Sequence, residues 1–142
     1  MKLRLADSSD APWINERYAS VHFHPSDLSR DLMVVAELGS VTAGMGRLVP
    51  AGDDACELGG MLVFEEFRGR GVARAIIEEL LRHTNGREVY CIPFAELEPI
   101  YEAVGFVRIE PDGDLPAYVH EKLDWCAREI PERTVILMKL RG

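Results

Sequence analysis

The pattern of apolar and polar positions predicts strands and one helix in the first half of the chain, before the period changes. Alternating or continuous β-branched and apolar runs predict strands, and Asp10 can cap a helix that has Pro12 in its first turn. Gly39-Ser40 lies between two apolar runs, which is typical of a two-residue hairpin. Gly59-Gly60 interrupts the next run and indicates a bulge or a close backbone approach. The elements expected are strands at 2–6, 32–38, 41–49 and 56–64 and a helix from Asp10 to about Ser20.

A helical period begins at Gly71 and is followed by further strands. An apolar stripe from Val72 to Leu81 has charged residues on its other side, and Asn85-Gly86 is a stop signal. A strand at 88–92 then makes 56–92 a βαβ unit, whose two strands we expect to be parallel. The remaining elements expected are helices at 96–104 and 117–129 and strands at 106–109 and 135–140. The fold class is therefore mixed α/β, with hairpins first and one crossover in the middle.

Composition adds limits to this picture. The chain has 142 residues, 47% of them hydrophobic, and we expect one domain over residues 1–142. A net charge of −8 argues against nucleic acid as a partner, and no apolar run reaches the length of a membrane span. The first residues lack a signal-peptide pattern, and the widely spaced Cys56, Cys91 and Cys126 suggest reduced thiols; we therefore expect a cytoplasmic protein with no metal site.

The segment "FRGRGVAR", residues 67–74, is the strongest local signal. It lies where a predicted strand ends and a predicted helix begins, so the free amides and the positive dipole end of the helix meet there. Gly69 and Gly71 allow a ligand close to the main chain, and Arg68, Arg70 and Arg74 add positive charge. These features indicate a phosphate or pyrophosphate site. The P-loop and dinucleotide-binding patterns both fail here, and a solvated turn is the plain alternative.

With its flanks, this segment resembles the central signature of the GNAT superfamily of N-acetyltransferases. Arg68, Gly71 and Ala73 fill the Arg/Gln-x-x-Gly-x-Gly/Ala positions, and Val63 fills the position that ends the preceding strand. The resemblance implies that acetyl-CoA is the cosubstrate, with its pantetheine arm along the strand and its pyrophosphate on the turn. The implied cofactor-binding residues are Met61, Leu62 and Val63 for the arm and Arg68, Gly69, Arg70, Gly71, Val72 and Ala73 for the pyrophosphate.

A second element, "PIYEAVGF", is similar to the short helix with tyrosine and the Gly-Phe strand start of the same family. The order of elements also agrees over most of residues 1–110. The resemblance implies a GNAT fold, with a mixed, mostly antiparallel sheet flanked by helices and splayed where two parallel strands part. It implies transfer of an acetyl group from acetyl-CoA to a primary amine by direct attack. A non-catalytic acyl-CoA sensor and a nucleotide-phosphate binder remain as alternatives.

The resemblance also suggests catalytic residues. Tyr101 occupies the position of the family's proton-donating tyrosine, with a core-packing role as the alternative. Glu57 lies where some members carry a catalytic glutamate. The alternative, that Glu57 is a solvent-facing carboxylate on a strand, fits the sequence equally well. In a regular strand Glu57, Gly59, Met61 and Val63 would share one face, but a bulge would break that parity.

The acceptor is not specified by the sequence. Small amines, amino acids, antibiotics, peptide N-termini and protein lysines all remain. The acidic balance weakly favours a small cationic amine, and a homodimer stays open. His22 and His24 are expected to border the acceptor cleft from one side, with His120 and the acidic residues of 110–124 on the other. Cys91 is expected to be a buried thiol without a chemical role. The segment "CIPFAELEP" and the long connection 111–133 depart from the family pattern near the expected acceptor.

Overall fold

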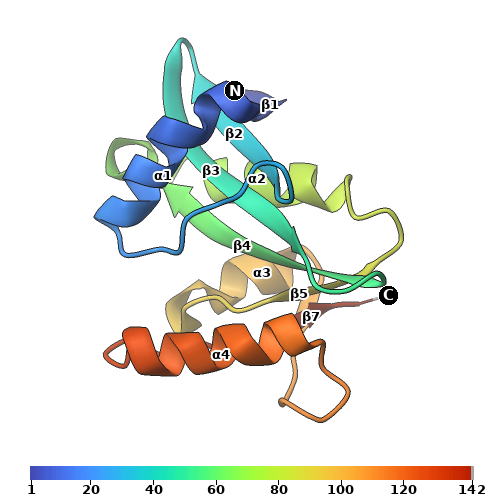
Figure 1. Ribbon diagram of the computed structural model, residues 1–142. Coiled ribbons are helices and arrows are strands. Elements are labelled where there is room, and N and C mark those ends of the chain that lie inside the picture. Colours follow the sequence, from blue (N-terminus) through green and yellow to red (C-terminus); the bar gives the residue numbers. More distant parts are fainter. Residues whose placement is uncertain (142) are drawn as a thin grey trace.

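The computed structural model describes residues 1–141, and within them the strands form a single mixed sheet of seven strands in the order β1-β2-β3-β4-β5-β7-β6 (Figure 1). β4 and β5 are its parallel pair, and the other neighbours are antiparallel. The strands are β1 (Lys2–Leu5), β2 (Leu32–Leu38), β3 (Val41–Pro50), β4 (Ala55–Val63), β5 (Glu88–Cys91), β6 (Phe106–Arg108) and β7 (Met138–Leu140). The helices are α1 (Ala11–Ser20), α2 (Val72–Leu81), α3 (Glu98–Ala103) and α4 (Ala117–Glu129). The predicted mixed, mostly antiparallel fold is confirmed.

The helices cover the two faces of the sheet. On one face α2 buries Ile76, Ile77 and Leu80 in a core that also includes Tyr101 of α3. The other face is shared, because α1 covers the first strands and α4 covers the last ones (Figure 1). The apolar stripe predicted for residues 72–81 is thus the buried face of α2.

The predicted hairpin and crossover are both present. Leu38 pairs with Val41 across Gly39-Ser40, and Gly39 has a φ of +64°, which glycine adopts without strain. In the βαβ unit Ala55–Leu58 pairs in parallel with Glu88–Cys91. The sequence therefore predicted the order and the pairing of these strands correctly.

Two local expectations need correction. Asp10 precedes α1, but its side chain does not cap the helix. Its carboxylate instead accepts hydrogen bonds from Arg4 at 2.9 and 3.0 Å and from the indole of Trp13 at 2.8 Å, so it connects β1 to α1. The last strand is shorter than 135–140, because Val135 makes an isolated bridge to Phe94 before β7 begins at Met138.

The splay of the sheet opens beside β4. Pairing between β4 and β5 ends at Leu58, although β4 continues to Val63 along β3. Beyond Leu58, no strand of the described chain pairs with β4 on its β5 side, so main-chain groups there are free for a ligand. The predicted separation of the two parallel strands is confirmed.

Among the helices that the structure describes, none is long and apolar enough to cross a membrane.

Candidate active site

The glycine–arginine turn ends directly at the N-terminus of α2. Gly69 and Gly71 both have a φ of +78°, and Gly71 is the residue that precedes the helix. The first helical bond runs from the amide of Ala75 to the carbonyl of Gly71 at 3.1 Å, so the amides of residues 72–74 precede the ladder and point out of the helix end. Several amides and the positive end of the dipole converge there, as an anion site requires.

A long groove leads from this turn along the free side of β4. Its volume is about 1520 Å³, and it passes between α3 and the end of α4. Most of the predicted cofactor-binding residues line it: Met61, Leu62, Val63, Arg68, Gly69, Gly71, Val72 and Ala73. Arg70 does not; its guanidinium lies 5.8 Å from the centre of the Phe67 ring. Arg74 lines the groove while it also pairs with Glu78 at 3.7 Å on the helix surface.

The predicted bulge in β4 is present and changes which residues share a face. Register shifts between Met45 and Arg47, opposite Gly60, whose φ is +58°. A Cβ on Gly59 would point at the Glu57 carboxylate, and one on Gly60 would point at Tyr18 and Arg47, so both glycines face the α1/α4 side. The alternation of a regular strand is therefore wrong here, because Met61 packs toward α2 instead of sharing the face of Glu57.

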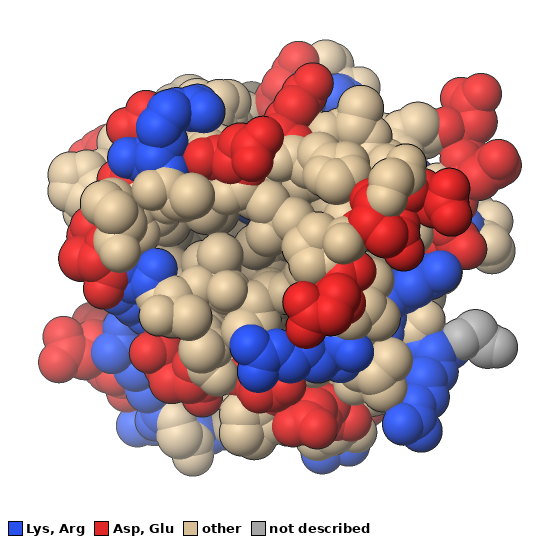
Figure 2. All heavy atoms as spheres, turned by 90° about the horizontal axis from the view of Figure 1, so that it is seen from below, with Lys and Arg blue, Asp and Glu red and all other residues tan. Residues whose placement is uncertain are grey.

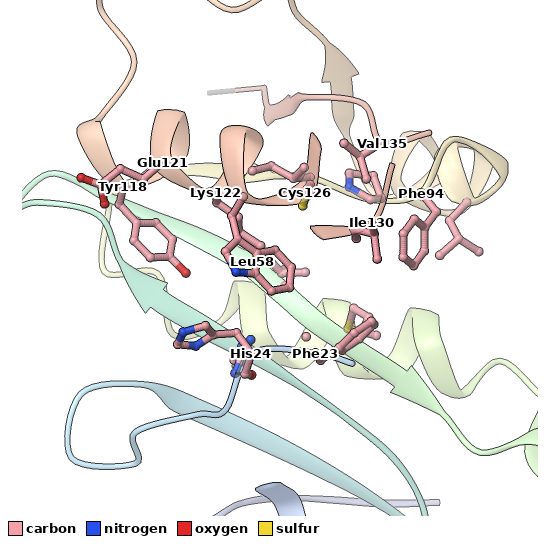
Figure 3. Close-up of a pocket in the computed structure, with 18 of the residues that line it drawn as sticks. Phe23, His24, Leu58, Phe94, Tyr118, Glu121, Lys122, Cys126, Ile130 and Val135 are labelled. Atoms are coloured by element: carbon pink, nitrogen blue, oxygen red, sulfur yellow. Dashed lines mark hydrogen bonds between the residues drawn. The ribbon is translucent and has the colours of Figure 1, made fainter. Parts of the chain in front are cut away.

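A second, smaller cavity of about 280 Å³ opens on the α1/α4 side of the bulge. Side chains of Tyr118 and Lys122 point into it from α4, and Phe23 and His24 approach from the connection after α1 (Figure 3). Its floor is the main chain of Gly59–Gly60. The face that carries α4 is hollowed near its centre, where uncharged side chains are exposed, and charges of both signs surround the hollow (Figure 2).

Tyr101 lies where the groove and the cavity meet, and it lines both. It is 4% exposed and packs edge-on against Phe106, with ring centres 5.7 Å apart. Burial raises the pKa of the Tyr101 hydroxyl well above its ordinary value, and Cys91 and Glu57 add to the shift. The group therefore stays protonated throughout the neutral range.

Glu57 is not a solvent-facing carboxylate. Its residue is 0% exposed, and its Oε2 accepts a hydrogen bond from Lys122 Nζ at 2.8 Å. Its Oε1 is buried and has no hydrogen-bond partner among residues 1–141. An unpaired buried oxygen costs free energy. Glu57 itself lines neither the groove nor the small cavity; it lies directly beneath Gly59, which does line the cavity.

The structure agrees with only part of the prediction for the histidines. His24 lines both spaces, whereas His22 lines the long groove and not the small cavity. His120 lines neither, and its Nε2 instead donates a hydrogen bond to the Asp112 carbonyl, 2.8 Å away. Of the acidic residues in 110–124, the cavity lining includes Glu121.

The cysteines are free and buried. Burial raises the pKa of the Cys91 thiol, so this residue is a poor nucleophile. No cluster of three or more potential metal ligands occurs in the described part of the chain.

Sequence reasoning missed several residues of the cavity, above all Arg47 and Lys122. Arg47 carried a signal, because it is a lone charge in the apolar strand predicted at residues 41–49. Lys122 had none, since a lysine in a mixed helix such as "AYVHEKLDWCARE" is usually solvated.

Comparison with known proteins identifies the family. The model of the acetyltransferase (GNAT) domain matches residues 29–108, which is more than half of the chain. The chain therefore belongs to the GNAT acetyltransferase family.

Solved structures share the fold over nearly the whole chain. A Mycobacterium tuberculosis protein in complex with CoA and NLQ has a TM-score of 0.73 at 20% identity and covers 96% of this chain and 98% of its own. The ribosomal-protein-S18-alanine N-acetyltransferase of Escherichia coli has a TM-score of 0.67 at 16% identity, with 98% and 92% covered. N-acetylglutamate synthase of Neisseria gonorrhoeae, complexed with coenzyme A and N-acetyl-glutamate, has a TM-score of 0.70 at 16% identity, with 100% and 36% covered. A search of curated protein sequences finds no match. At these identities the structural likeness supports the fold.

Proposed function

We propose that the protein is an N-acetyltransferase that moves an acetyl group from acetyl-CoA directly to a primary amine. The observation that carries this proposal is the continuous path from the α2 turn, along the unpaired side of β4, to Tyr101. Such a path fits a long ligand with an anionic end at the turn and a reactive end beside the small cavity.

In this proposal the pyrophosphate lies on the turn of residues 68–73 and accepts hydrogen bonds from free amides at the start of α2, among them those of residues 72 and 73. Met61–Val63 holds the pantetheine arm by main-chain bonds. The acceptor enters from the small cavity, its nitrogen attacks the thioester carbonyl, and the carbon–sulfur bond breaks. Tyr101 gives its proton to the departing sulfur. No covalent enzyme intermediate is needed, in keeping with the buried, high-pKa thiol of Cys91.

The amine must lose a proton before it attacks, because an alkylammonium has a pKa of about 10.4. Glu57 is the proposed base, acting directly or through water. Its free Oε1 borders the bulge, and its pairing with Lys122 holds the carboxylate in one orientation.

The experiment is an acetyl-CoA turnover screen over a panel of amines, with release of free CoA as the readout. Tyr101→Phe should lower kcat by about 100-fold or more while leaving CoA affinity within about twofold, because only the proton donor is removed. Val107→Ala, a half-buried change on β6 away from the groove, is the matched control and should retain turnover.

A non-catalytic acyl-CoA sensor would bind CoA and show no turnover with any amine, and Tyr101→Phe would then change nothing measurable. A nucleotide-phosphate binder would be protected from heat by ATP or NAD more than by CoA. Either result would overturn the proposed function.

A further inference from the structure

Arg47 is a buried cation without a counter-ion in the described chain. The residue is 4% exposed, lies on β3 opposite Gly59, and lines the small cavity. Its Nη1 donates to the His24 carbonyl at 3.0 Å, and the guanidinium stacks on the Tyr18 ring at 4.6 Å. Its Nε is buried and finds no acceptor within residues 1–141, where the guanidinium also makes no ion pair.

The other charges that line the cavity are paired, apart from Glu121. Arg30 pairs with Asp31 at 2.8 Å, and Lys122 pairs with Glu57 at 2.8 Å. Asp31 is further occupied by the Ser26 hydroxyl at 2.7 Å. Glu121 lies on the exposed rim. The interior of the cavity therefore carries one uncompensated positive charge, although the whole chain has a net charge of −8.

A buried and unpaired guanidinium is costly unless a ligand completes its bonds. Its planar fork matches a carboxylate, which can accept two parallel hydrogen bonds. Two supports hold it in place, namely the Tyr18 ring below it and the His24 carbonyl beside it. A donor fixed in this way has little conformational entropy left to lose on binding.

The rest of the cavity is mainly apolar. Its walls include the aromatic rings of Phe23, Phe94, Tyr118 and Trp125. A volume of about 280 Å³ accommodates one small molecule. The free Oε1 of Glu57 borders the same bulge as Arg47, because Cβ atoms on Gly59 and Gly60 would meet the two groups respectively.

We propose that the acceptor is a small amino acid-like molecule, whose carboxylate binds Arg47 and whose body is apolar or aromatic. This inference rests on the proposed acetyl transfer and names the substrate class of that site. In it the amino group faces Glu57 and the thioester, and the carboxylate neutralises the buried guanidinium. It differs from the cationic amine favoured by the net charge, because the charge buried in the cavity without an ion-pair partner, in the part of the chain that the structure describes, is the Arg47 guanidinium.

The first test uses the wild-type protein with matched pairs that differ by one carboxylate: phenylalanine and phenethylamine, tryptophan and tryptamine, leucine and isoamylamine. The carboxylate member should have a kcat/KM about 10- to 100-fold higher, since a charged hydrogen bond is worth about 1.5–3 kcal/mol and 1.4 kcal/mol is tenfold. Equal or better turnover of the decarboxylated amines would overturn the inference and leave acetyl transfer intact.

Calorimetry with CoA-saturated protein separates the two proposals. If no acceptor is turned over, the acetyl-transfer proposal fails. The affinities of the protein for the two members of each pair then still decide whether Arg47 binds a carboxylate. Stronger binding of the carboxylate members supports the site, whereas equal or absent binding of both members overturns it.

The second test is Arg47→Gln. It should raise KM for the carboxylate acceptor about 10- to 100-fold and leave KM for its decarboxylated partner within about twofold, so that the preference disappears. Arg47→Lys should restore part of the preference, because it keeps the charge and loses the fork. Arg82→Gln, an exposed change on the far end of α2, should keep the wild-type preference.

A purely structural role for Arg47 would lower turnover of both acceptors equally, and that result would contradict the inference. Thermal unfolding and CoA binding are measured for each variant. If Arg47→Gln does not fold, Arg47→Lys and the wild-type pairs carry the test.

Discussion

At the scale of single residues, the site depends on charges that the fold has removed from water. Glu57 is fully buried, and Lys122 alone among the described residues donates to its carboxylate. Such pairs contribute little net stability, but removing one partner leaves the other charge buried alone. The pair therefore fixes the orientation of Glu57 beside the bulge.

This pair predicts a large coupling energy. Lys122→Met should lower the free energy of unfolding by about 3 kcal/mol, because it leaves the Glu57 carboxylate buried without its partner. The double variant Glu57→Gln/Lys122→Met should recover about half of that loss, since neither charge remains. Urea unfolding of the wild type, both single variants and the double variant measures the cycle. Additive losses would show that the two side chains are not coupled in solution.

At the scale of elements, the bulge in β4 explains why two glycines adjoin there. Gly60 needs its φ of +58°, and a Cβ on it would lie 2.5 Å from the Tyr18 hydroxyl and 2.8 Å from Arg47 Nε. The same hydroxyl donates to the Gly60 carbonyl at 2.7 Å. The bulge thus brings α1, β3 and β4 together beneath the small cavity.

Gly60→Ala should therefore destabilise the protein by about 3 kcal/mol, with backbone strain and overpacking both contributing. Gly52→Ala is the matched control, because Gly52 has a φ of +86° and open space around it, and it should cost only about 1–2 kcal/mol. Chemical unfolding of the two variants gives the comparison. Equal losses of stability in the two variants would mean that the contacts of Gly60 with Tyr18 and Arg47 do not add to the cost of the substitution.

The contact between β1 and α1 predicts a dependence of stability on pH. The hydrogen bonds from Arg4 hold the pKa of the Asp10 carboxyl well below its usual range, while burial opposes them. A lowered folded-state pKa gives stability that is fully present above the unfolded pKa of about 3.9 and is lost as the pH falls toward the folded value.

Asp10→Asn should thus lower the free energy of unfolding by about 1–3 kcal/mol at pH 7 and by less at pH 3. Urea unfolding at the two pH values tests this, with the exposed Asp53→Asn as a control that should change neither. A difference of the same size at both pH values would rule out the ion pair as its cause.

The elements themselves were largely predictable from the sequence. Local signals fixed them, such as Gly39-Ser40 for the hairpin and the apolar stripe of α2, and residues 117–129 form a helix with the predicted bounds. The face of each residue beyond Gly59 was not predictable, because a single bulge reverses the alternation.

At the scale of the whole molecule, the site combines segments that are distant in the sequence. The turn and β4 carry the signals that the sequence analysis used, and they line the groove as expected. Arg47 and Lys122 lie before and after that region, and their meeting at the bulge depends on how α4 packs against the sheet. Long-range packing of this kind leaves no periodic trace in the sequence, so the acceptor side could only be recognised in three dimensions.

The central claim is that the turn before α2 binds the pyrophosphate of CoA, and a calorimetric titration of CoA into the protein tests it most directly. We expect binding in the micromolar range and about 5- to 10-fold weaker binding in Gly71→Ala. Alanine disfavours the positive φ at this position, so the turn of the variant relaxes and must return to the strained conformation before its amides can bind the pyrophosphate. Gly86→Ala, at a similar positive φ of +75° beyond the other end of α2, should bind like the wild type. No detectable heat with CoA, or equal affinity in all three proteins, would contradict the account.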